Sequence, residues 1–285
     1  RIRIDGATGM PGAPSFYGTG HPNRMYLDVI QYYIANNVGA SQDNGDGTYT
    51  VEYFTALPAD FTGRAMVAIG GHPAAIGVED ADGVVGNQRA AASSVVWYPA
   101  GAERDFAVAA DNCNACHKDL QFHGANRTTN VEICIVCHNA DLAENEGFAF
   151  GRMIHSIHTA SPSYAGGEFA EVTYPQSIAN CDTCHVEGAY NTARVEARAV
   201  SLAAGADGTV WTDDIATTPT AQACGTCHMS VAAMGHFNTQ GGAVAITKDL
   251  IQQVGGLPNG QEACAVCHGP GNEFDTTRYH NPGVE

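Results

Sequence analysis

No stretch of the 285-residue chain has the roughly 18 consecutive apolar residues that a membrane-spanning helix needs. The first residues, Arg1-Ile2-Arg3-Ile4-Asp5, also lack the apolar segment of a secretory signal peptide. We therefore expect that a signal peptide was removed or that the chain is a piece of a longer one. No transmembrane segment is predicted.

Positive charge is scarce in this chain. Its 13 Lys and Arg residues face 30 Asp and Glu residues, which gives a formal net charge of −17. Such an acidic chain is a poor match for nucleic acid or for an anionic membrane as its main partner. It fits a basic partner, a cation or simple solubility, and solubility is the plainest of these interpretations.

The chain has no cysteine outside one repeated pattern, C-x-x-C-H. The five motifs are Cys113-Asn114-Ala115-Cys116-His117, Cys134-Ile135-Val136-Cys137-His138, Cys181-Asp182-Thr183-Cys184-His185, Cys224-Gly225-Thr226-Cys227-His228 and Cys264-Ala265-Val266-Cys267-His268. No cysteine is left over for a structural disulfide or for a lipid anchor within these residues.

The spacing of the motif identifies its chemistry. Two thiols three positions apart add to the two vinyl groups of one haem, and the next residue places an imidazole on the iron. A redox or zinc C-x-x-C pair needs no histidine after it, and chance would not put one of only 12 histidines after all five pairs. We therefore predict five covalently bound c-type haems. Because haem attachment takes place outside the cytoplasm in bacteria, we expect an exported protein.

Seven histidines are not part of a motif. Five of these lie in the same region of the chain as the motifs, either between two motifs or after the last one. These five candidate distal ligands are His123, His155, His158, His236 and His280. His155 and His158 are three residues apart, so they would share a helical face and serve two haems, or else form a pH-sensitive surface pair. His21 and His72 both precede proline in turn-like contexts, and we expect neither to bind iron.

The number of spare histidines near the motifs equals the number of irons, which predicts bis-histidine coordination throughout. Methionine would raise the potential of a haem, but Met153, Met229 and Met234 are better explained as core residues. A bis-histidine iron has no open position for a substrate. The count therefore favours electron transfer over catalysis at the iron.

The first 110 residues contain no cysteine and are predicted to form strands. The predicted strands are Tyr49 to Phe54, Arg64 to Ile69, Ser94 to Tyr98 and Asp105 to Ala109, and residues 25–35 fit either a helix or a strand. Residues 43–47 (DNGDG) predict a turn; their carboxylates suit Ca²⁺, but they do not match an EF-hand loop, so Ca²⁺ is the weaker interpretation.

We predict two domains of mixed class. Residues 1–110 would form a small antiparallel β-barrel or sandwich, and residues 111–285 a pentahaem domain of loops and short helices. About 35 residues per haem cannot build a conventional core, so the porphyrins would have to form it and lie close together.

Six segments are distributed along residues 111–285: Cys113 to Asn126 (CNACHKDLQFHGAN), Val131 to Asn139 (VEICIVCHN), Met153 to Thr159 (MIHSIHT), Tyr174 to His185 (YPQSIANCDTCH), Ala223 to Phe237 (ACGTCHMSVAAMGHF) and Glu262 to Gly271 (EACAVCHGPG). In combination they resemble the OmcA/MtrC family of outer-membrane multihaem cytochromes. The resemblance implies a Greek-key β-barrel before the pentahaem domain, a place at the outer-membrane surface, and the five distal histidines named above. It also implies electron transfer to redox partner proteins or to metal oxides, flavins and other extracellular acceptors.

The chain differs from that family in having only one β-plus-pentahaem half and no cysteines for a disulfide in the β domain. A half unit fits a fragment, a stand-alone carrier or a subunit that assembles with itself or with other cytochromes. A periplasmic location, a multihaem reductase with one open haem and a polymerising haem filament remain the alternatives.

Overall fold

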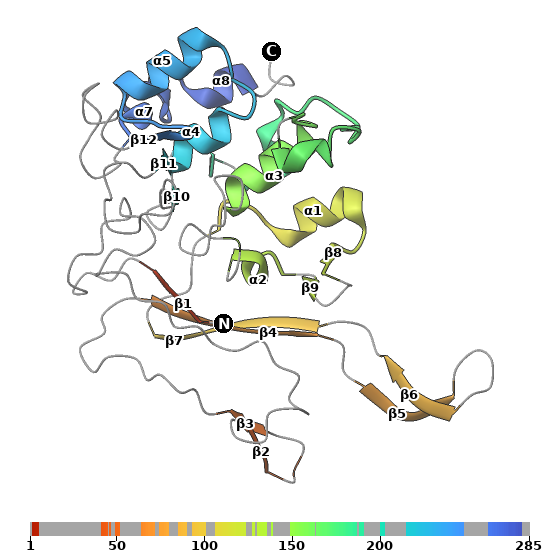
Figure 1. Ribbon diagram of the computed structural model, residues 1–285. Helices are drawn as coiled ribbons and strands as arrows, with labels where there is room; N and C mark the ends of the chain where they lie inside the picture. Colours follow the sequence, from red (N-terminus) through yellow and green to blue (C-terminus); the bar gives the residue numbers. More distant parts are fainter. Residues whose placement is uncertain are drawn as a thin grey trace.

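A computed structural model gives the fold of the chain (Figure 1). It describes residues 2–5, 41–44, 46, 49–51, 64–71, 74–79, 85–89, 93–100, 106–123, 127–128, 130–135, 138, 149–162, 164–186, 188–190, 200–202, 215–247 and 262–280. The predictions for residues 25–35, His21, His72 and Cys137 lie outside this part of the chain.

The N-terminal region is built from antiparallel strands. A three-stranded sheet has the order β1 (Ile2–Asp5), β4 (Arg64–Gly71), β7 (Ser93–Ala100). In β4 and β7, Ala68 pairs with Val96 and Ile69 with Val95. The strands predicted at 64–69 and 94–98 are therefore confirmed.

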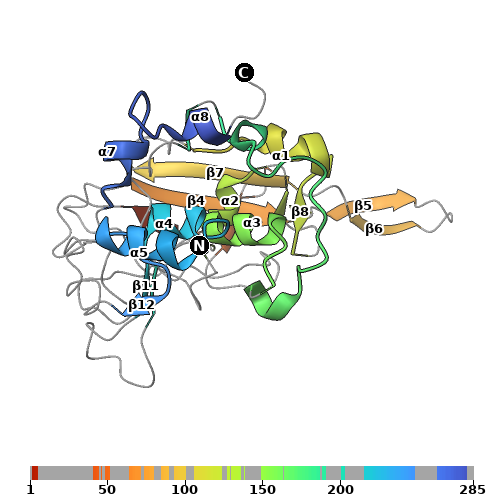
Figure 2. The same cartoon turned by 90° about the horizontal axis from the view of Figure 1, so that it is seen from above.

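Two hairpins accompany this sheet. The first joins β2 (Ser41–Asp43) to β3 (Tyr49–Val51), with Asp43 paired to Tyr49, around the predicted acidic turn. The second joins β5 (Ala74–Glu79) to β6 (Val85–Arg89) and projects away from the sheet in both views (Figures 1 and 2). Closure of the strands into a barrel, and the domain boundary at residue 110, stay predictions.

The strand predicted at 105–109 is wrong in its described part. Val108 makes only a single bridge, to His185, and α1 (Ala110–His117) begins two residues later. The Val186 amide donates to the Ala107 carbonyl at 3.0 Å. The segment therefore fastens the first motif to the third instead of extending the sheet.

From α1 onward the described residues form two helical units. The first helical unit, residues 106–190, contains α1, β8 (Gln121–Phe122), β9 (Arg127–Thr128), α2 (Glu132–Ile135), α3 (Phe150–His158), η2 (Tyr164–Gly167) and η3 (Cys181–Thr183). The second helical unit, residues 215–280, contains β11 (Ile215–Thr217), α4 (Pro219–Cys224), α5 (Val231–Thr239), β12 (Ile246–Thr247), α7 (Cys264–His268) and α8 (Thr276–His280); β10 (Val200–Leu202) pairs with β11.

The two units lie side by side over one face of the β1–β4–β7 sheet (Figures 1 and 2). Helix α2 packs against β4 and β7, and α3 packs against α4 across the boundary between the units. Ile133 and Ile135 of α2 are buried there, as is Val131 just before it.

Among residues 106–280 whose side chains are described, the apolar core is small. Apart from the group around α2, its buried members are alanines, and the largest fully buried side chains are Thr217 and Thr218. Side chains of this size do not fill the interior of a domain at normal packing density. This is compatible with the prediction that porphyrins form the interior of the helical region.

Candidate haem-binding sites

The four C-x-x-C-H motifs that are described in full each fold as one helical turn, and the second motif has the same closing hydrogen bond. The amide of the motif histidine donates to the carbonyl of the first cysteine at 2.8 Å in His138, 2.9 Å in His185 and 2.9 Å in His228, while α1 and α7 contain the other two motifs. Residues i, i+3 and i+4 of such a turn share one face. Two thiols and one imidazole are thus presented together.

In three of the motifs the two cysteines differ in exposure, whereas Cys181 and Cys184 of the third motif are both half-buried. In α1, at the end of α4 and in α7, the first cysteine is half-buried and the second is exposed. Burial is the main cause that raises the pKa of Cys224 to about 11 and that of Cys264 to about 12, and the nearby charge of Glu262 adds to it. A site that disfavours a thiolate suits the neutral sulfur of a thioether.

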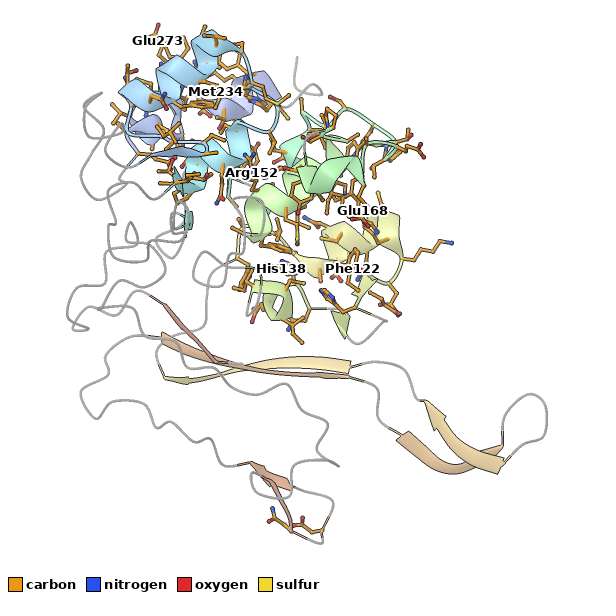
Figure 3. All side chains as sticks on the ribbon, in the orientation of Figure 1. Phe122, His138, Arg152, Glu168, Met234 and Glu273 are labelled. Atoms are coloured by element: carbon orange, nitrogen blue, oxygen red, sulfur yellow. The ribbon has the colours of Figure 1, made fainter. Side chains whose placement is uncertain are left out.

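The structure brings every motif histidine together with one of the five histidines predicted as distal ligands. The ring pairs are His117–His158 (site 1, 6.0 Å between centroids), His123–His138 (site 2, 6.0 Å), His155–His185 (site 3, 6.0 Å), His228–His280 (site 4, 5.9 Å) and His236–His268 (site 5, 6.1 Å). Each candidate is used once, in a different pair. Figure 3 shows His138 of site 2 between α2 and α1.

The spacing of the rings fits an iron between them. Two metal–nitrogen bonds of about 2 Å, plus a ring radius of about 1.1 Å on each side, place two axial imidazoles about 6 Å apart. All five pairs lie between 5.9 and 6.1 Å. The interplanar angles range from 13° in site 3 to 88° in site 1, so it is the distance and not the ring orientation that is common to them.

In four of these rings the Nδ1 atom lies within hydrogen-bond distance of a backbone carbonyl. The Nδ1 atoms of His155 and His158 lie 2.8 and 2.9 Å from the carbonyls of Gly151 and Ile154, one turn back in α3. The same atom of His280 lies 3.1 Å from the Thr276 carbonyl, and that of His268 lies 3.1 Å from the Phe274 carbonyl. Because a carbonyl only accepts, Nδ1 must carry the proton, and Nε2 keeps the lone pair that a metal needs.

Burial is the main cause that lowers the pKa of His155. A histidine whose cationic form is disfavoured stays neutral over a wider pH range, and only neutral imidazole binds a metal. Together, the five ring spacings, the carbonyl-held Nδ1 atoms and the small core show that the residues present fit five bis-histidine c-type haems.

His123 reaches site 2 from an unusual backbone conformation. It follows β8 in the turn toward β9 and has a φ of +55°. Only a few residue types other than glycine, histidine among them, adopt this left-handed region with any frequency. The sharp turn after Phe122 directs the chain so that the His123 ring lies 6.0 Å from that of His138, with the two ring planes at 21° to each other.

Two acidic residues that our sequence analysis did not single out hold the second unit together. Glu262 accepts hydrogen bonds from the Thr218 hydroxyl and the Thr220 amide, both at 2.6 Å, and from the Ala221 amide at 2.7 Å. It thereby caps α4 from a position two residues before the fifth motif. An acidic residue beside a motif gives no sequence signal of this role, because its partners are more than 40 positions away.

Asp275 is the second of these residues. Its buried carboxylate accepts from the Gly271 amide at 2.6 Å, the Thr277 hydroxyl at 2.8 Å and the Thr277 amide at 2.9 Å. These hydrogen bonds hold the pKa of Asp275 below its ordinary value, and the bond from the Gly271 amide has the largest effect. The residue caps the five-residue helix α8, which ends at the distal ligand candidate His280.

The Asp275 cap makes a pH-dependent prediction for site 4. Because the folded state lowers the pKa, the stabilisation is complete above the ordinary aspartate value of 3.8 and is lost as the pH falls through the lower folded value. We expect acidification below pH 3.8 to release His280 and give one high-spin haem, seen by absorption and electron paramagnetic resonance spectroscopy. Asp275→Ala removes both acceptor oxygens and should show this species at neutral pH, whereas a variant identical to the wild type at every pH would contradict the role.

The described residues provide no group of three or more His, Cys, Asp or Glu side chains arranged to hold a free metal ion. The described residues of the acidic turn, Asp43, Asn44 and Asp46, therefore give no support for a Ca²⁺ site. None of the helices in the described ranges has the length and apolar character needed to cross a bilayer.

Comparison with known proteins gives one family match. Residues 106–281 are similar to the family described as outer membrane cytochrome MtrC/MtrF-like, domains II/IV. Among solved structures, the crystal structure of MtrC from Shewanella baltica OS185 is similar, with 21% sequence identity and a TM-score of 0.43 over 85% of this chain. The match covers 32% of that chain, so this protein spans about a third of its length. No curated protein matches.

Proposed function

The chain belongs to the family of MtrC/MtrF-like outer membrane cytochromes, and we propose that it relays electrons outside the cytoplasm through five bis-histidine haems. As a member of that family it is a cytochrome that carries c-type haem and serves electron transport. The number of haems, their ligation and the acceptor are the proposed parts. The observation that supports them most directly is the set of five histidine pairs.

In the proposed assembly the cysteines of each motif hold the haem edge and the two histidines of each pair bind its iron. When bound, c-type haem supplies a one-electron ferric/ferrous couple at each site. The protein contributes fixed geometry. Helices α3, α5 and α8 and the turn at His123 would hold the second imidazole of each pair, which would leave no position for a substrate.

The ligand pairs suggest an order for the sites. His117 and His123 lie six residues apart and connect sites 1 and 2, while His155 and His158 on α3 connect sites 3 and 1. Site 3 borders site 4 because α3 packs against α4. Cys181 of site 3 also lies close enough to Cys227 of site 4 for the charge of one to affect the other. The pKa of Cys181 is raised to about 11, mainly by burial, then by Asp182, and to a smaller extent by Cys227. Sites 4 and 5 share the second unit, so we propose the order 2, 1, 3, 4, 5.

The reductase alternative requires one motif histidine without a partner ring. Among the distal candidates, His280 is the last residue of the described chain, so its pair is the first place to look for a missing partner. Its ring lies 5.9 Å from that of His228, a spacing like that of the other pairs. We therefore favour the relay. By analogy with the family, we propose extracellular acceptors such as metal oxides or flavins, and other redox proteins, as its partners.

Electron paramagnetic resonance of the oxidised holoprotein tests this proposal. Five bis-histidine irons should give only low-spin ferric signals, and intact-mass spectrometry should count five haem additions. The reduced protein should not bind CO. A stoichiometric high-spin signal, or CO binding at one haem, would instead identify a site with an open position.

A further inference from the structure

Tyr174 lies where site 1 and site 3 meet. Its ring stands edge-on to the His158 imidazole, with centroids 5.8 Å apart and an interplanar angle of 87°. Its hydroxyl lies 3.9 Å from the Sγ atom of Cys184. His158 belongs to the first ligand pair and Cys184 to the third motif, so a single side chain touches both.

The hydroxyl of Tyr174 has a defined chemical role at Cys184. In a thioether the sulfur carries no hydrogen, so the tyrosine O–H is the only group of the two that can donate. A tyrosine hydroxyl is protonated at neutral pH and is both a donor and an acceptor. The O–H dipole points its positive end at the sulfur of site 3.

A second contact holds the hydroxyl in place. Gln176 hydrogen bonds to the Tyr174 side chain, and its Nε2 atom donates to the Thr183 hydroxyl at 2.7 Å. Thr183 lies inside the third motif, next to Cys184. The side chain of Tyr174 is therefore oriented by the motif that it contacts.

The ring of Tyr174 constrains the other site. The His158 imidazole is held on one side by the Ile154 carbonyl, 2.9 Å from Nδ1, and meets the Tyr174 ring on another. Two contacts at different angles leave the imidazole little freedom to rotate. The orientation of an axial imidazole and the polar groups around a haem are levers by which a protein tunes the iron.

We propose that Tyr174 is a positioning residue shared by sites 1 and 3: its ring sets the orientation of the His158 imidazole, and its hydroxyl donates to the Cys184 sulfur. This inference rests on the proposed five bis-histidine sites. It links the electronic properties of two neighbouring sites to one side chain that binds neither iron.

Two substitutions in the holoprotein separate the two contacts. Tyr174→Phe keeps the ring and removes the hydroxyl, so the potential of one haem should shift downward, because a positive dipole beside it is lost, while all low-spin g-values stay. Tyr174→Leu removes both contacts, so the low-spin signal of a second haem should also shift its g-values. Tyr164→Phe and Tyr164→Leu are matched controls, because the Tyr164 ring packs on Phe169 and should leave all five sites unchanged.

The readouts are electron paramagnetic resonance and a potentiometric titration of the purified holoprotein. Unchanged potentials in Tyr174→Phe together with unchanged g-values in Tyr174→Leu would overturn the inference. If Tyr174→Leu does not assemble, the conservative Tyr174→Phe decides alone, through the single downward shift in potential. Failure of the bis-histidine proposal is distinct, because it would appear as a high-spin signal in the wild type.

Discussion

Replacing His236 by alanine is expected to convert one of five haems from low-spin to high-spin iron and to let that haem alone bind CO. His236 is exposed on α5, and its ring lies 6.1 Å from that of His268. Alanine is the best helix former, so α5 should persist while the sixth ligand is lost. Electron paramagnetic resonance of the oxidised protein and a CO difference spectrum of the reduced protein measure the change, at about one fifth of the total haem.

Two further variants sharpen this result. His236→Met supplies a thioether ligand, so the iron should stay low-spin, resist CO and have a higher potential. Val231→Ala lies on the same helix with its side chain 91% exposed, and it should leave the spectrum unchanged. A fully low-spin His236→Ala variant would mean that another group ligates site 5, and the pairing with His268 would then be wrong.

Replacing Glu262 by alanine is expected to loosen the start of α4 in the second helical unit. The carboxylate accepts bonds from one hydroxyl and from two amides at the start of α4. Removing a charged acceptor from three donors should cost about 2–4 kcal/mol. Because unfolding of a chain with several cofactors is not a two-state process, the local measurement is more direct.

Amide hydrogen exchange followed by mass spectrometry provides that measurement. Exchange in the α4 peptide should become roughly 30-fold faster or more in Glu262→Ala. Glu262→Gln keeps one acceptor oxygen and should lie between this variant and the wild type. Glu273→Ala, which removes an exposed carboxylate from the same unit, is the matched control. Unchanged protection of α4 in Glu262→Ala would show that the cap contributes nothing.

The sequence allowed the chemistry of the sites to be predicted further than their arrangement. The motif spacing is local, so the helical turns around each C-x-x-C-H follow from the sequence alone. The helix over His155 and His158 is also confirmed. Their partners were not predictable, because His158 meets His117 and His155 meets His185 only through the packing of α3 between two motifs.

The failures have physical causes of the same kind. The run before α1 has strand-forming residues, but Val108 finds a single partner, in the third motif, so no ladder forms. Tyr174, Glu262 and Asp275 act through contacts that neither composition nor periodicity encodes. A tyrosine between two sites and a carboxylate at a helix start are identified only once distant segments are placed together.

The histidine pairs have a consequence for how the chain matures. Every pair is closed within one helical unit: sites 1 to 3 use residues between 113 and 185, and sites 4 and 5 use residues between 224 and 280. A polypeptide that emerges N-terminus first through an export channel can therefore complete its first three centres before the last two have been translocated. We therefore expect a substitution that prevents sites 4 and 5 from forming to leave sites 1 to 3 intact.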